Sequence, residues 1–583
     1  MNNRRFESNA QLSRRCLLSA PLALAGCATA GPYFGRTTPP SSQRLVYSNG
    51  EEPASLDPAQ SVGASSEIIM STLLDSLTSL DPLTLEPAAG LATHYEIDTR
   101  GIHYTFYLRG HPNPRGIRLP HPNSTSPPFS RNHGAQPDRT PALWSDGLPI
   151  TAHDFVYSWR RFIDPATAAP MASYIAPVGN AEAITNGSLP PSSLAVRAVD
   201  DFTFQFDLAA PAPSFLKLLW QPVFAAVPQQ AIESARRRGR ESSWTEAGHY
   251  VSSGPFLLRE WKPYDRIVVS RNPRYWEAQS VAMEEIIFLP IADGTTNVSL
   301  YRAGGMQSMD PRLIPPTLIP ALARKRDFVT VPALRTFWLL LNLTTPPLDR
   351  PAVRYALNLA TDKNAVAKFL GAGQTPAKGV VPPMSGYPLL TTLPVSIHGR
   401  ELNILGFDPR AARELLRAEG IGELDFAMTI PTLPNIREIA VIVQRQWREY
   451  AGVRLTLSEQ GPAEWLQQLI DKRYAHVTQD SWTARCADPS DYLNYFGPPH
   501  YSTWTDATFD QEFVAGNRIL NPAVRMKALS DCEAKLMRAM PVIPIFYDRW
   551  TYLEAPYLRG LTPNPFAAPQ FKYAWIDTNW RPQ

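Results

Sequence analysis

The sequence predicts a large protein of mixed α/β or α+β class with more than one domain. The chain has 583 residues, which is room for roughly four domains or for two large lobes. Strand-like and helix-like segments alternate along it without a repeat of fixed length. The mean hydropathy of −0.22 argues against overall disorder and against a polytopic membrane protein. The 58 prolines, about twice the usual share, predict many rigid and extended connections.

The first 26 residues have the pattern of a secretory signal peptide. Arginines precede a short apolar run at residues 17–25, and small residues follow it. This run is too short for a membrane-spanning helix, which needs roughly 20 residues. Residues 24–27, Leu-Ala-Gly-Cys, resemble a bacterial lipobox, which implies that Cys27 is acylated and begins the mature protein. Residues 27–45 are rich in Ala, Gly, Thr, Pro and Ser and are expected to form a flexible tether.

Residues 13–18, Ser-Arg-Arg-Cys-Leu-Leu, also resemble a twin-arginine export signal. Ordinary secretion with a basic n-region stays open as the alternative. By either route we expect an extracytoplasmic lipoprotein that is anchored to a membrane, in the periplasm or on the outer surface of the cell envelope.

Local patterns place the secondary structure in chain order. Alternating or continuous apolar runs predict strands at residues 44–47, 104–109, 202–208, 266–270, 285–290 and 542–547. Apolar residues at a helical period predict helices at residues 154–162, 351–359, 409–419, 436–450 and 523–540. The segment 111–143 shows neither period and is predicted to be an exposed loop or insertion. Its His111, His121 and His133 are interpreted as solvated loop residues rather than metal ligands.

Charge and motifs favour a binding protein over an enzyme. The 56 basic and 53 acidic residues give a net charge of +3, too balanced for a nucleic-acid footprint. No nucleophile elbow, HExxH, P-loop, dinucleotide fingerprint or EF-hand loop occurs, so no cofactor or metal is implied. Asp57 and Asp81 each precede a proline and are interpreted as turn residues rather than catalytic acids. The 14 Trp, 22 Tyr and 24 Phe suit a cleft with large apolar walls, although most are expected in the core.

Ordered segments from about residue 46 to the C-terminus resemble one family. The most specific is residues 144–161, which read Trp-Ser-Asp-Gly-Leu-Pro-Ile-Thr-Ala-His-Asp-Phe-Val-Tyr-Ser-Trp-Arg-Arg. The others are residues 49–58, 73–81, 253–256, 271–276, 300–304, 351–357 and 540–545. The chain resembles the extracellular solute-binding proteins of ABC importers, family 5, which includes oligopeptide- and dipeptide-binding proteins. The segment 111–143 is an insertion relative to the family pattern.

The resemblance implies an α/β protein with the two-lobed type II fold of periplasmic binding proteins. It would be a member of the large cluster C, with an extra subdomain in the first lobe. The first lobe is expected at residues 46–335 and again at 541–583, and the second at 336–540. The ligand is expected between the lobes, which close over it by bending at a two-strand hinge.

The resemblance also implies which residues line the cleft. Family members hold peptides mainly through backbone contacts. The segments expected to line the cleft here contain Val62, Gly63, Ala64, Tyr174, Phe337, Trp338, Ser481, Trp482, Thr483, Phe546 and Tyr547. Tyr174 could instead pack within its lobe and make no contact with the ligand. Phe337 and Trp338 alternate on a strand, so only one of them can face the cleft, and Phe546 and Tyr547 have the same ambiguity.

One residue departs from the family pattern. In peptide binders, the position held here by Arg485 carries the carboxylate that binds the peptide's ammonium, whereas Asp488 and Pro489 are in place. A guanidinium there would repel a free amine and favour an anion. Three interpretations stay open: the ligand lacks a free amine or is acidic, the peptide is held in another register, or Arg485 pairs internally, for instance with Asp488 or Asp491.

These observations predict a lipid-anchored substrate-binding protein of an ABC importer that captures oligopeptides or a related extended solute. It is expected to be a monomer, to contact the permease subunits, and to be neither an enzyme nor a nucleic-acid binder. The alternatives are a receptor for an acidic or amine-free solute, a sensory receptor that does not feed a transporter, and a secreted hydrolase. Cys486 and Cys532 remain after processing, either as a disulfide or as two buried free thiols.

Overall fold

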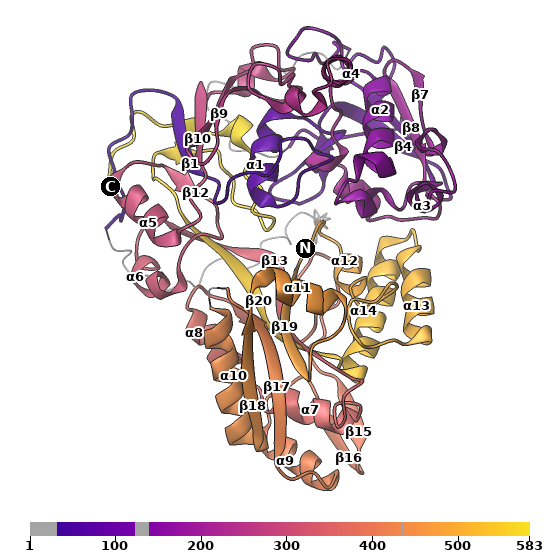
Figure 1. The fold of residues 1–583 in the computed structure, drawn as a ribbon, viewed down its shortest axis with the longest axis vertical. Coiled ribbons are helices and arrows are strands. Elements are labelled where there is room, and N and C mark those ends of the chain that lie inside the picture. The colour runs from indigo at the N-terminus through magenta and orange to yellow at the C-terminus, as the bar shows by residue number, and fades with distance from the viewer. Residues whose placement is uncertain (1–31, 123–138, 434, 583) are drawn as a thin grey trace, which may run out of the picture.

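The computed structural model describes residues 32–122, 139–433 and 435–582. It consists of two bodies of mixed α/β structure, joined by long strands (Figure 1). The signal peptide, Cys27 and residues 123–138, which include His133, lie outside the described residues, so the predictions about them stay predictions. None of the described helices is long and apolar enough to cross a membrane.

The first body, called the first lobe, is built on a core of buried residues that lie between Leu45 and Phe288 and between Ala555 and Ile576. It contains two five-stranded sheets. One sheet has the order β12 (Ser308–Met309), β1 (Arg44–Ser48), β11 (Glu285–Leu289), β10 (Arg266–Arg271) and β9 (Phe256–Lys262). The other has the order β6 (Ile117–Arg118), β4 (Ala92–Ile97), β5 (His103–Leu108), β8 (Thr203–Asp207) and β7 (Val196–Asp200).

Helices and short hairpins complete this half of the molecule. The helices are α1 (Ala64–Leu73), α2 (Ala152–Ile163), α3 (Ala181–Thr185), α4 (Gln229–Arg237), α5 (Gly294–Ala303) and α6 (Ile319–Leu322). The two-stranded sheets are β2 (Thr78–Leu80) with β3 (Pro87–Ala89), and β21 (Leu558–Arg559) with β22 (Trp575–Ile576).

Helix α2 shows how the local sequence sets an element. The Asp154 carboxylate accepts hydrogen bonds from the backbone N–H and the hydroxyl of Thr151, which satisfies donors at the helix start. Phe155, Trp159 and Phe162 form its buried face. The helix predicted at residues 154–162 is therefore confirmed, and the specific family motif lies across its start.

The second body, called the second lobe, is built on a core of buried residues between Leu334 and Phe546. Its six-stranded sheet has the order β14 (Thr375–Pro376), β20 (Val542–Leu553), β13 (Phe328–Leu341), β19 (Val477–Thr483), β17 (Leu424–Pro431) and β18 (Val453–Gln460). A hairpin pairs β15 (Pro394–Ile397) with β16 (Arg400–Asn403). The helices are α7 (Pro351–Leu359), α8 (Lys363–Leu370), α9 (Pro409–Ala418), α10 (Ile436–Ala451), α11 (Pro462–Ile470), α12 (Ser490–Leu493), α13 (Ala507–Asn517) and α14 (Pro522–Ala539).

Strands β13 and β20 run between the two bodies as an antiparallel pair (Figure 1). Tyr552 and Leu553, at one end of β20, pack in a small third core with Met309 of β12. The other end of β20 lies in the core of the second lobe. The predicted strand at 542–547 therefore continues to Leu553, beyond what its apolar run indicated.

The other predicted strands and helices are confirmed, with ends that differ by a few residues. Two predicted loops are more ordered than expected. The insertion begins with β6, which pairs with β4, and His121 Nε2 lies 2.9 Å from Glu277 Oε1. In the described part of the tether, Phe34 packs against the third core, and its N–H and that of Gly35 donate to the Asp327 carboxylate.

Of the two aromatic pairs from which one residue each was expected to face the ligand, Phe337, Trp338 and Phe546 are buried. Phe337 is buried and stacks on Phe546, with ring centroids 4.8 Å apart. Trp338, on the opposite face of β13, has no exposed surface and packs against aromatic residues that follow α12. Both faces of the sheet are covered at this point, so both residues belong to the core. Tyr547 is half-buried, and its hydroxyl accepts a hydrogen bond from the N–H of Gly379.

Cys486 and Cys532, the two cysteines in the part of the chain that the structure describes, are separate buried free thiols. The open question left by the sequence is answered in favour of the free thiols, and burial raises the pKa of Cys532 to about 11.

We predict that Trp338→Ala lowers the free energy of unfolding by about 3–5 kcal/mol, because it leaves a large cavity in the core of the second lobe. Chemical denaturation measures this loss. The milder Trp338→Phe should retain ligand affinity. If either substitution lowered ligand affinity but left stability at the wild-type level, Trp338 would be a ligand-binding residue and not a core residue.

Candidate ligand-binding site

An open cavity of about 790 Å³ lies between the two lobes and is called the interlobe cavity. The first lobe contributes Ala64, Glu67, Ile68, Ser71, Tyr174, Trp220, Gln221, Pro222 and Arg312, and the second contributes Thr483, Ala484 and Arg485. Residues 566–569, which follow the return to the first lobe, close one side.

Helix α1 begins at the cavity wall. Gly63, its N-cap, has a φ of 90°, a conformation that glycine adopts far more easily than other residues. Among the described residues, no side chain caps this helix, so N–H groups of its first turn stay available beside Ala64. The predicted pair Gly63 and Ala64 therefore lies at the cavity with backbone donors to offer.

Arg485 lines the cavity but is already paired. Its Nη2 and Nε lie 2.5 and 2.7 Å from Oδ1 of Asp491, and its backbone N–H donates to Oδ2 at 2.7 Å. Burial alone would lower the pKa of Arg485, but Asp491 outweighs it and raises that pKa. Of the three interpretations, internal pairing is the one found in the structure, with Asp491 as the partner.

Aromatic rings surround the same guanidinium. The Arg485 side chain lies 5.2 Å from the ring centroid of Tyr174 and 5.6 Å from that of Trp482. The Trp482 indole N–H donates to Asp491 at 3.1 Å, so Trp482 holds the ion pair and does not itself line the cavity. The predicted residues Tyr174, Thr483 and Arg485 are thus brought together.

Asp488 has a different role. Its carboxylate forms a two-bond ion pair with Arg525, with distances of 2.7 and 2.8 Å, and both side chains are almost fully buried. Burial by itself would raise the pKa of Asp488, but the hydrogen bonds and charge of Arg525 lower it. Asp488 therefore fastens the loop after β19 to α14 and does not line the interlobe cavity.

The first lobe touches this loop directly. The Gln221 side-chain amide donates to the carbonyl oxygen of Arg485 at 2.6 Å, and Lys217 Nζ lies 3.4 Å from the carbonyl oxygen of Ala487. Trp220 packs against Phe566, with ring centroids 5.5 Å apart. These contacts fix the width of the cavity in this structure.

Several of these cavity residues were missed by the sequence analysis. Glu67 is the fourth residue of α1, and nothing in the local sequence indicated that its charge would face a ligand. The stretch from Trp220 to Pro222 contains no recognisable motif. The wall at 566–569 follows a stretch with Pro563 and Pro565, for which the sequence analysis predicted no contact with a ligand.

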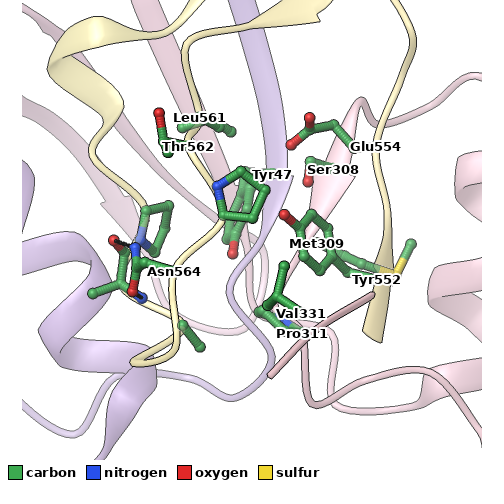
Figure 2. A pocket seen from close by; sticks show the side chains of 14 residues that line it. Tyr47, Ser308, Met309, Pro311, Val331, Tyr552, Glu554, Leu561, Thr562 and Asn564 are labelled. Atoms are coloured by element: carbon green, nitrogen blue, oxygen red, sulfur yellow. Dashed lines mark hydrogen bonds between the residues drawn. The ribbon is translucent and has the colours of Figure 1, made fainter. Parts of the chain in front are cut away.

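A second, smaller cavity of about 350 Å³ lies beside the hinge strands (Figure 2). Tyr47, Ser308, Tyr552 and Glu554 line it, and it shares residues 567–569 with the interlobe cavity. Burial raises the pKa of Glu554 from 4.5 to about 8. Its Oε2 atom is shielded from solvent and has no hydrogen-bond partner among the described residues.

Residues 139–503 match the bacterial extracellular solute-binding proteins, family 5 Middle. The chain belongs to this family. The periplasmic oligopeptide-binding protein OppA of Escherichia coli K12 is 30% identical over 564 residues, which cover 94% of each chain. The fold matches the Escherichia coli murein tripeptide binding protein MppA with a TM-score of 0.72, at 26% identity over 93% of this chain and 99% of MppA. It matches Haemophilus influenzae OppA in complex with RPPGFSPFR with a TM-score of 0.71, at 25% identity over 92% of this chain and 100% of that chain.

This family 5 protein is therefore the solute-binding component of an ABC importer, and it acts outside the cytoplasm. Family members bind their solutes without transforming them, so the prediction that the chain is not an enzyme is confirmed. The two-lobed fold implied by the resemblance is likewise confirmed by the solved structures.

We predict that Asp491→Asn destabilises this family 5 protein by about 1–3 kcal/mol, because it strands the partly buried Arg485. Thermal unfolding measures the loss. Asp425→Asn, which removes the partner of exposed Arg454, is the matched control and should cost less than about 0.5 kcal/mol. If the two substitutions lowered stability equally, the Arg485–Asp491 ion pair would contribute no more to stability than an exposed ion pair does.

Glu554 predicts a pH dependence of stability. Because its pKa is raised in the folded state, the folded protein holds a proton that the unfolded chain releases above about pH 4.5. Stability should therefore fall as the pH rises from about 4.5 to about 8, and Glu554→Gln should raise the melting temperature at pH 8 and flatten this slope. Asp480 and Glu533, whose pKa values burial raises to about 6 and about 7, leave part of the slope in the variant. An unchanged slope would contradict the assignment to Glu554.

Proposed function

We propose that this solute-binding protein captures short peptides in the interlobe cavity and delivers them to the permease of its importer. The observation that carries the proposal is a single cavity whose walls come from both lobes, joined by strands that run between them. Bending at β13 and β20 would open and close such a site. The relatives of this chain include oligopeptide-binding and murein tripeptide-binding proteins, which favours peptides as its ligands.

The backbone around the cavity suits an extended ligand. Strand β19 pairs with β13 along its whole length, but with β17 only at Val477 and Thr478. Among the described residues, the far edge of β19 at 481–483 thus has no neighbouring strand. A peptide could add there as a further strand, with the free N–H groups of the first turn of α1 opposite.

The same proposal includes the anchoring and the partners. Cys27 would carry the lipid, which would keep the captured solute close to a membrane. The permease subunits would contact the lobes when they are closed. A lobe boundary near residue 335 suits this scheme, whereas the return to the first lobe comes after Phe546, the last core residue of the second lobe.

A second candidate is a receptor for an acidic or amine-free solute, and Arg485 at the cavity is the observation that favours it. Its guanidinium would have to leave Asp491 to serve such a ligand, and this exchange would cost a buried ion pair.

Native mass spectrometry of the exported protein, purified without refolding, tests the proposal. We expect a ladder of retained masses that fragment as peptides of a few residues. Trp220→Ala should release most of this material, because it removes a wall of the cavity. A single non-peptide anion in place of the ladder would establish the second candidate instead.

A further inference from the structure

Three charged side chains line the interlobe cavity: Glu67, Arg312 and Arg485. The two arginines each have a carboxylate of their own. Arg485 pairs with Asp491, and Arg312 pairs with Asp310, whose Oδ1 accepts from Nε at 2.7 Å. Each pair sums to zero, so the charge left in the cavity is the single negative charge of Glu67.

Glu67 lies in the first turn of α1, exposed to the cavity. Among the described residues, its carboxylate has neither an ion pair within 4.0 Å nor a hydrogen-bond donor. The positive charge of Arg312 acts on Glu67 through space, and Glu67 in turn helps to raise the pKa of Tyr174. Enclosure between the lobes raises its pKa, and Arg312 only partly opposes this effect. An ionised carboxylate in such a place is costly until a cation reaches it.

We infer that Glu67 binds a positively charged group of the ligand, in place of the carboxylate that position 485 lacks. The inference rests on the proposed capture of peptides and names the chemistry that the site selects. It also relates the charges on opposite walls of the cavity: Arg485 is neutralised by Asp491 on the second lobe, and the anionic anchor lies on α1 of the first lobe.

The cation is an ammonium, and a peptide offers two sources of it. One is the N-terminal amine and the other is a lysine side chain. Both present donors that match a carboxylate, and the partial desolvation of Glu67 strengthens the attraction to either one.

The test uses three synthetic pools of tripeptides to pentapeptides built from Ala, Leu, Ser and Tyr. The first pool has free amines, the second is N-acetylated, and the third is N-acetylated with one internal lysine. Each pool is offered to the exported protein after bound material has been removed, and capture is measured by native mass spectrometry. Wild type should capture the first or the third pool about tenfold or more above the second, and which of the two it prefers identifies the source of the ammonium.

The variants separate charge from structure. Glu67→Gln should remove the preference and keep the melting temperature, because no ion pair or hydrogen bond to the Glu67 side chain is lost. Glu67→Asp should restore part of the preference. Glu438→Gln, which changes another exposed glutamate in the first turn of a helix, is the matched control and should behave as wild type.

The outcomes distinguish this inference from the proposed function. Equal capture of acetylated and free pools, or a preference that survives Glu67→Gln, would overturn the role of Glu67 and leave peptide capture standing. If wild type captures none of the three pools, peptide capture itself fails, and the inference fails with it.

Discussion

The antiparallel pairing of β13 with β20 is the interaction on which the rest of the structure depends. Each strand contributes to two hydrophobic cores, one at either end, so the pair connects bodies that otherwise bury their own surfaces. Charged residues occupy the middle of the pair, where Arg335 Nη1 lies 3.6 Å from Asp548 Oδ2. Between the larger cores this stretch carries only a small buried cluster of Ala333, Trp550 and Ala567, which suits bending at a hinge.

Charge pairing follows depth in this protein. Asp488 and Arg525 are almost fully buried and form a two-bond ion pair, and Arg485 at the cavity wall is held by a nearly buried Asp491. Glu67, which faces the cavity itself, has no such partner among the described residues. A buried charge must be compensated within the fold, whereas a charge at a ligand site can be left for the ligand to compensate.

The return of the chain to the first lobe shapes both cavities. Residues 567–569 form a wall that the interlobe cavity shares with the smaller cavity beside Glu554 (Figure 2). The wall is held as a turn, because Asn564 Oδ1 accepts hydrogen bonds from the N–H groups of Phe566 and Ala568. The hinge, the ligand cavity and Glu554, whose pKa burial raises to about 8, therefore lie within one small region.

The sequence by itself determined the elements and the family. Strand alternation and helical period are local properties, and short ordered motifs survive at 30% identity. Only the tertiary structure decided which side chains meet. It buried both Phe337 and Trp338, it chose Asp491 over Asp488 as the partner of Arg485, and it brought Glu67 into the cavity. Periodicity in the sequence predicts on which face of a helix or strand a side chain lies. Whether that face is buried or exposed, and which charged residues lie beside it, depends on segments that are far away in the sequence.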